Sequence, residues 1–108
     1  MAVKLADMSF EGPFSLLQWE PPNRAAVYSI MMPSGEQGSY KVLYIGESEN
    51  MADRGFYRSH HKYDCWERQA VSIDNLKIAF YRMPNSTQEE RRVVEQQLIE
   101  RYDPPCNK

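Results

Sequence analysis

The sequence predicts an α+β domain with a small central three-stranded antiparallel sheet flanked by helices. Two runs rich in β-branched and aromatic residues, 25–32 and 40–45, are separated by a turn-rich segment and predict a hairpin with a loose tip. A third run, 76–83, alternates its side chains in the manner of a half-buried strand. A capped stretch with an apolar stripe, 87–102, predicts a long helix.

The chain has 108 residues, 42% of them hydrophobic and 26% charged, which is the size and composition of one globular domain. Residues 1–22 hold aromatic side chains punctuated by Gly12-Pro13 and Pro21-Pro22, and we expect an irregular cover or one edge strand there. Residues 23–107 are expected to form the core that carries the motifs.

Two helices are expected between the second and third strands. Ser48 or Asn50 can cap a helix that runs to about Lys62, although Gly55 in its interior costs roughly 1 kcal/mol relative to alanine. Gly55 therefore marks a break or a close approach. A shorter helix is expected over residues 63–72.

On the last predicted helix, Glu95 lies within the apolar stripe. With Val94 at zero and about 100° per residue, Leu98 lies at about 40° and Glu95 at about 100°. An ionised carboxylate that faces a core needs an ion pair, hydrogen bonds or a metal ion. The partner of Glu95 is left open: a cation, either Arg91 one turn earlier or one from the sheet, or a bound metal.

A formal net charge of −2 and a pI near 5.7 exclude a protein that coats nucleic acid by bulk attraction. A local basic run remains, because residues 54–63 contain Arg54, Arg58, His60, His61 and Lys62 and no acid. The run is either a solvated helix face or a phosphate-binding surface.

The N-terminal residues lack an apolar leader, and no stretch approaches the roughly 20 apolar residues needed to cross a bilayer. We therefore expect a soluble, cytoplasmic protein. Cys65 and Cys106 lie far apart in the sequence and lack partners at zinc-finger spacing, so we expect reduced thiols and neither a zinc site nor a disulfide.

The chain carries, in this order, Tyr28, Tyr44-Ile45-Gly46, Arg54, Glu95 and Asn107. This ordered set, within residues 23–107, resembles the GIY-YIG nuclease superfamily. The first family motif matches residues 26–28, ending in Tyr28, and the second matches Tyr44-Ile45-Gly46, so that each falls on a strand of the predicted hairpin. The other matched residues are Arg54, Glu95 and Asn107.

The resemblance implies an endonuclease that hydrolyses DNA phosphodiester bonds with one divalent metal ion, Mg²⁺ or Mn²⁺, in DNA repair, recombination or the processing of foreign DNA. Glu95 would bind the metal. Tyr28 would help to activate the attacking water, for which its ordinary pKa of about 10 must be lowered by Arg54 or a neighbouring group. Arg54 would also offset phosphoryl charge. Tyr44 would orient water or phosphate, and Asn107 would tie the C-terminal tail to the site.

The chain departs from the family pattern at three places. Ala26 replaces a glycine, which is a mild change if φ is negative there. The separation of Tyr28 from Tyr44 is longer than usual, and the hairpin loop can absorb it. Arg58 stands where many members have His or Tyr, four residues after the matched arginine.

Either His60 or His61 could replace that missing group, if the chain bulges near Gly55. Arg58, His61 and Lys62 are then candidates for contacts with the DNA backbone, which position a substrate without reading its sequence. Target choice would come from DNA structure, a partner protein or a homodimer.

Two other functions compete with the nuclease. A module of the same fold could bind nucleic acid or protein after losing catalysis. Alternatively, the resemblance arises by chance, and Trp19, Trp66 or Met31-Met32 contact a protein partner. Metal dependence separates the enzyme from both.

Overall fold

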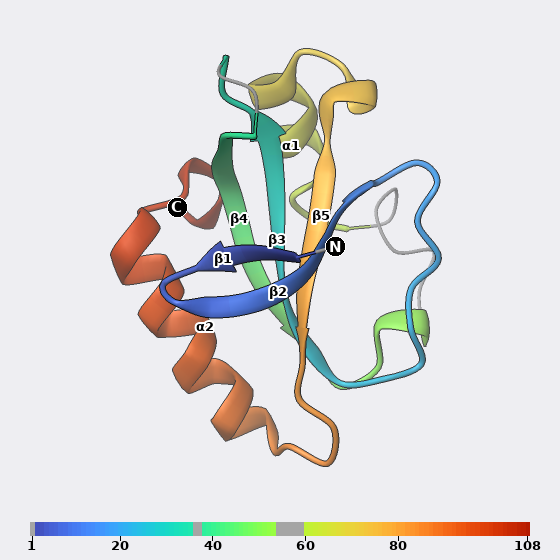
Figure 1. Ribbon diagram of the computed structural model, residues 1–108, viewed down its shortest axis with the longest axis vertical. Coiled ribbons are helices and arrows are strands. Elements are labelled where there is room, and N and C mark those ends of the chain that lie inside the picture. The colour runs from blue at the N-terminus through green and yellow to red at the C-terminus, as the bar shows by residue number, and fades with distance from the viewer. Residues whose placement is uncertain (1, 36–37, 54–59) are drawn as a thin grey trace.

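The computed structural model of this chain describes residues 2–35, 38–53 and 60–108. Its elements in chain order are β1 (Ala2–Leu5), β2 (Met8–Ser15), β3 (Ala26–Pro33), β4 (Tyr40–Ser48), η1 (Met51–Asp53), α1 (Tyr63–Ala70), η2 (Ile73–Asn75), β5 (Lys77–Arg82), α2 (Gln88–Tyr102) and η3 (Pro105–Asn107). The strands form one antiparallel sheet in the order β1-β2-β5-β3-β4 (Figure 1). The α+β class is thus confirmed.

The described sheet has five strands, so the prediction of three is wrong. Of the two expectations for the N-terminal segment, the irregular cover is wrong over residues 2–15, and the edge strand is closer, because β1 lies at the edge of the sheet. Residues 2–15 form a hairpin whose second strand pairs with β5. Gly12 and Pro13 do not end a strand, because they occupy an irregularity where the register of β2 shifts between Glu11 and Phe14. A bulge tolerates a proline, which has no N–H to donate. Gly12 has φ +119°, and a Cβ there would lie 2.8 Å from the carbonyl oxygen of Ile78.

The central hairpin and the third predicted strand are confirmed. β3 lies between β4 and β5, and its residue Tyr28 stands opposite Gly46 on β4. Ala26 is buried in this regular strand and has no positive φ, so the replacement of glycine needs no special backbone. The first-motif and second-motif residues therefore face each other across one antiparallel ladder.

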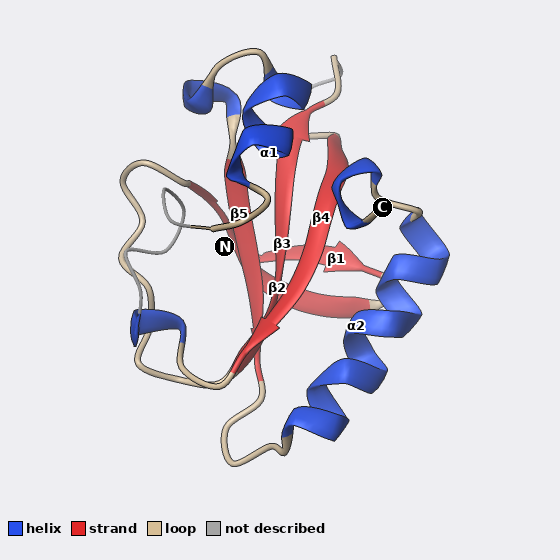
Figure 2. Ribbon diagram, turned by 180° about the vertical axis from the view of Figure 1, so that it is seen from behind, coloured by secondary structure: helices blue, strands red, loops and turns tan. Residues whose placement is uncertain are grey.

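Both faces of the sheet are covered. Tyr28 and Trp66 belong to an apolar cluster on the face that carries α1 (Figure 2). On the opposite face Val27 packs in a cluster with Phe10 and Leu98, where the β1–β2 hairpin crosses the other strands (Figure 1). Helix α2 runs beside β4 along the edge of the sheet (Figure 2), and its residue Leu98 belongs to the second cluster.

Helices α1 and α2 agree with the predicted helices over 63–72 and 87–102, whereas the helix predicted between β4 and α1 does not. The capping box is present at α2, because the Thr87 hydroxyl accepts from the Glu90 N–H at 3.1 Å while Glu90 Oε1 accepts from the Thr87 N–H at 2.8 Å. The helix predicted from Ser48 or Asn50 to Lys62 is wrong at its described ends, since β4 extends to Ser48 and residues 60–62 form a turn before α1. Gly55 lies outside the described residues.

The expectation of reduced thiols is also wrong. Cys65 on α1 and Cys106 on η3 form a disulfide, with Cα atoms 5.8 Å apart. They are 41 residues apart, and only the return of the chain after α2 brings them together. No helix in the described ranges is long and apolar enough to cross a membrane. Cytoplasmic localisation stays a prediction, and a disulfide is more typical of oxidising compartments.

Candidate functional site

The centre of the candidate site is the ring of Tyr28, which lies directly over Gly46. A Cβ on Gly46 would overlap Cζ and the hydroxyl of Tyr28 and would lie 2.9 Å from Cε1. Only glycine therefore allows the first-motif tyrosine to cross the second-motif strand at this level. This packing gives a physical reason for pairing the two motifs, since one supplies the ring and the other the space for it.

His60 is hydrogen-bonded to Tyr28, and its main-chain neighbour defines the tautomer of its ring. Its Nδ1 lies 3.0 Å from the main-chain nitrogen of Lys62, and a backbone N–H can only donate, so Nδ1 accepts. In the neutral ring, Nε2 then carries the proton and donates it to the Tyr28 hydroxyl oxygen at 2.9 Å. The Tyr28 oxygen accepts from His60 and can donate its own proton onward.

Tyr44 is the second hydroxyl of the site. Burial, followed by the Glu95 carboxylate, raises the pKa of Tyr44, a hydrogen bond with Tyr28 opposes this, and Glu47 adds to it. Tyr44 is therefore a neutral phenol near neutral pH. The chain of polar contacts runs from His60 through Tyr28 to Tyr44, on the face of the sheet that α1 covers.

An aromatic cluster holds His60 in place. Its ring centroid lies 4.5 Å from that of buried Trp66 and 5.1 Å from that of Tyr44. His61 stacks on the other side at 4.6 Å, with the planes 16° apart, and is itself exposed. Of the two histidines left open by the sequence, His60 contacts Tyr28 and His61 faces solvent.

Glu95 on α2 lies near enough to Tyr44 for its charge to raise the pKa of that phenol, and it lacks the ion pair that the sequence allowed. Arg91 is buried and donates from Nε to Glu47 Oε1 at 2.8 Å, and from another guanidinium nitrogen to the carbonyl and hydroxyl oxygens of Ser86. Among the described residues, no ion pair or hydrogen bond reaches the Glu95 carboxylate. Burial, and next the charge of Glu47, raise the pKa of Glu95, while Arg92 acts in the opposite direction.

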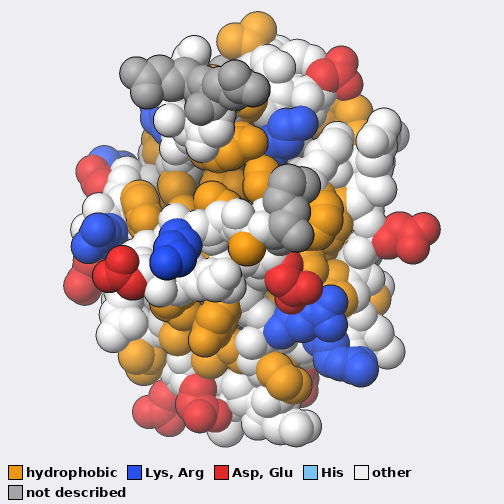
Figure 3. Space-filling view, in the orientation of Figure 1, with side chains coloured by type: hydrophobic (Ala, Val, Ile, Leu, Met, Phe, Trp, Pro, Cys, Tyr) orange, Lys and Arg blue, Asp and Glu red, His pale blue; other side chains and the backbone are white. Residues whose placement is uncertain are grey.

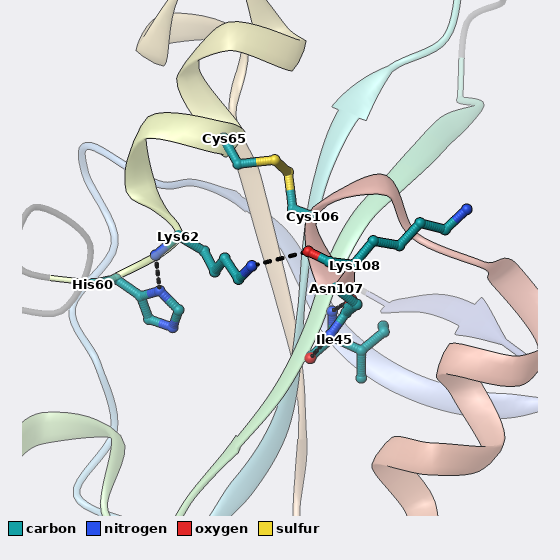
Figure 4. Close-up of a disulfide and its surroundings, with 7 residues drawn as sticks. All are labelled: Ile45, His60, Lys62, Cys65, Cys106, Asn107 and Lys108. Atoms are coloured by element: carbon teal, nitrogen blue, oxygen red, sulfur yellow. Dashed lines mark hydrogen bonds between the residues drawn. A yellow bond between two sulfur atoms is a disulfide. The ribbon is translucent and has the colours of Figure 1, made fainter.

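Asn107 binds the main chain in the middle of the second motif. Its Oδ1 accepts from the Ile45 N–H at 2.8 Å, and its Nδ2 donates to the Ile45 carbonyl at 2.9 Å (Figure 4). On the other side of β4, Ile45 stands opposite Ser29 of β3. The Asn107 carboxamide therefore takes the place of a neighbouring strand at the free edge of the sheet, between Tyr44 and Gly46.

The basic residues of the sequence prediction are only partly described. Lys62 donates from Nζ to the main-chain oxygen of Lys108 at 3.2 Å and lies at the surface beside the C-terminal tail (Figure 4). Arg54 and Arg58 lie outside the described residues. The described part of the site therefore contains two tyrosines, one histidine, one half-buried carboxylate and one main-chain clamp.

The described residues fit one divalent ion held by a single carboxylate. A half-buried carboxylate without a cationic partner is the donor that such an ion requires, and Mg²⁺ keeps several water ligands when it binds to one or two carboxylates. No group of three or more His, Cys, Asp or Glu side chains suited to a metal occurs in the described ranges. Glu95 alone, or Glu95 with Glu47 nearby, is thus the available donor set.

Sequence reasoning missed the role of Glu47. Besides pairing with Arg91, it lines a polar pocket of about 380 Å³ together with the N-terminal residues of α2. One signal was present: Arg91 lies at about 60° on the helical wheel, inside the apolar stripe, so a buried guanidinium needed an acid from elsewhere. Nothing in the sequence pointed to Glu47 as that acid.

Comparisons of the chain with protein-family models, curated proteins and solved structures find no match. The resemblance to the GIY-YIG nucleases therefore rests on the matched residues of the sequence.

Proposed function

We propose that this protein is a metal-dependent endonuclease of the GIY-YIG type that hydrolyses DNA phosphodiester bonds. The observation that carries the proposal is the convergence of Tyr28, Tyr44, His60 and Glu95, which come from four separate segments: β3, β4, the turn before α1, and α2. Phenolic oxygens near an unpaired carboxylate suit the activation of water beside a bound divalent cation.

In this proposal Tyr28 first loses its hydroxyl proton and then, as a phenolate, takes a proton from the attacking water. The His60 ring N–H donated to its oxygen stabilises negative charge there, which is the direction that a general base requires. Tyr44, a neutral phenol, donates a hydrogen bond and orients the water or the phosphate. Glu95 holds the ion, which when bound supplies Lewis-acid stabilisation of the phosphate and leaving oxygens.

His60 also accounts for the departure at Arg58, where many family members have His or Tyr. The His60 imidazole, 2.9 Å from the Tyr28 hydroxyl, can replace the His or Tyr that many family members have four residues after the matched arginine. The histidine then comes from the turn before α1. We propose that His60, and not His61, belongs to the catalytic set, while His61 and Lys62 remain candidates for backbone phosphate.

The test is cleavage of supercoiled plasmid and of flap and junction DNAs in Mg²⁺ or Mn²⁺. Glu95→Gln should lower the rate by about 100-fold or more, the size of effect seen when a group that stabilises a transition-state charge is removed. Glu100→Gln, an exposed carboxylate on the same helix, is the matched control and should cut normally. EDTA should stop the reaction.

Cutting that survives both Glu95→Gln and EDTA would contradict the proposal. A binding module without catalysis is the second candidate, favoured by the net charge of −2 and by the interspersed acidic and basic side chains on the face in Figure 3. Binding of junction DNA, unaffected by EDTA and without cleavage under any metal, would support that candidate instead.

A further inference from the structure

The Cys65–Cys106 disulfide joins the two segments that position the candidate site (Figure 4). Cys106 immediately precedes Asn107, whose side chain clamps the main chain of Ile45. Cys65 lies in the first turn of α1, directly after the turn that carries His60. One covalent bond therefore connects the clamp on one side of the site with the imidazole on the other.

Apart from the packing of buried Pro104 and Cys106 in the core, few polar contacts of the described chain hold the C-terminal tail in this position. η3 is a single three-residue turn. Within the described chain, one exposed hydrogen bond, from Lys62 Nζ to the main-chain oxygen of Lys108, links the tail to the segment before α1. Cys106 itself is fully buried. The two Asn107 bonds are made to a strand edge, where water competes for the same N–H and carbonyl once the tail moves away.

We infer that the disulfide is a positioning element of the site, and that its reduction by a dithiol releases the Asn107 clamp and thereby loosens Tyr44 and Gly46. A dithiol would attack the sulfur of Cys65, because Cys65 is a half-buried residue and Cys106 is fully buried. The S–S bond breaks, the two cysteines gain two protons and two electrons as thiols, and the dithiol becomes a cyclic disulfide. The site is complete in the oxidised chain only.

The inference is independent of DNA cleavage, and its test uses amide hydrogen exchange of the full chain, oxidised and after treatment with dithiothreitol. The Ile45 N–H, which is bonded only to Asn107 in the described chain, should exchange at least tenfold faster after reduction. The Val27 N–H in the centre of the sheet is the internal control and should change by less than threefold. The Asn107 side-chain amide signals should shift at the same time.

Variants of Asn107 and of the two cysteines test the same contact without reductant. Asn107→Ala should give the fast Ile45 exchange without reductant. Cys65→Ser/Cys106→Ser should give it too and should no longer respond to dithiothreitol; if that variant does not fold, Cys65→Val/Cys106→Val fills the buried volume of the sulfurs instead. Equal acceleration at Ile45 and Val27, or unchanged Asn107 side-chain signals in the reduced wild-type chain, would overturn the inference and leave the disulfide as a general stabiliser.

Discussion

Gly46→Ala tests the packing on which the candidate site depends. The added Cβ would overlap the hydroxyl end of the Tyr28 ring, and this ring is only 3% exposed. The ring cannot swing into solvent without losing its contact with His60. The backbone itself is no obstacle, because Gly46 has no positive φ and alanine can adopt its conformation.

The expected loss of stability follows from two opposed contributions. Overpacking of a well-packed interior costs typically about 1–3 kcal/mol. The change from glycine to alanine restores about 0.4–1 kcal/mol by restricting the unfolded chain. The net destabilisation should be about 1–2 kcal/mol, which lowers Tm by about 5–10 °C in a domain of this size.

A double-mutant cycle with Tyr28→Leu separates this cause from others. Leucine keeps apolar contact but lacks the Cε, Cζ and hydroxyl atoms that the new methyl group would meet. In the Tyr28→Leu chain, Gly46→Ala should therefore be neutral or slightly stabilising in urea unfolding. If the two changes add within about 0.5 kcal/mol, Tyr28 is not what requires glycine at position 46, and the reasoning fails.

Three further predictions concern the charges and the cap of α2. Glu95→Gln should raise Tm in metal-free buffer, because burial and the charge of Glu47 raise the pKa of Glu95 in the folded chain, so that ionised Glu95 destabilises the fold. In thermal scans the increase in Tm should be complete at pH values well above the folded-state pKa. It should be absent below the ordinary glutamate pKa of about 4.3. Arg91→Met should cost about 3–5 kcal/mol in urea unfolding, because the Glu47 side chain, which is only 14% exposed, loses its cation, and adding Glu47→Met should recover much of the loss. Thr87→Ala should cost about 1 kcal/mol by removing the hydroxyl that accepts from Glu90, whereas Thr87→Ser should keep most of it.

The parts of the fold that the sequence predicted are those with local causes. Two β-rich runs around a turn predict the β3–β4 hairpin, and a capping box and two prolines predict the ends of α2. The N-terminal hairpin was missed because Gly12 and Pro13 have two interpretations, a strand end or a bulge. The choice between them depends on the approach of Ile78 from β5, which no local pattern records.

The candidate site divides in the same way. The burial of Glu95 follows from its position on the helical wheel, and the structure leaves it half-buried. The helical wheel does not show that Glu95 lacks an ion pair with Arg91, because the Arg91 guanidinium pairs with Glu47 on β4 instead. The disulfide was mispredicted for a related reason: a pairing across 41 residues depends on where the tail returns after α2.

These non-local contacts meet at the three residues of the second motif. Asn107 takes both main-chain polar groups of Ile45 on the free edge of β4, β3 lies along the other edge, and the Tyr28 ring covers Gly46. Tyr44 is the remaining residue: it stands opposite Ile30 of β3, and Asn107 fixes the next residue along the strand. In the proposed function, a side chain held in this way needs little reorganisation, which is the condition for effective electrostatic catalysis. Loss of the tail clamp should therefore act on Tyr44 first, although no atom of Cys106 is needed for the chemistry.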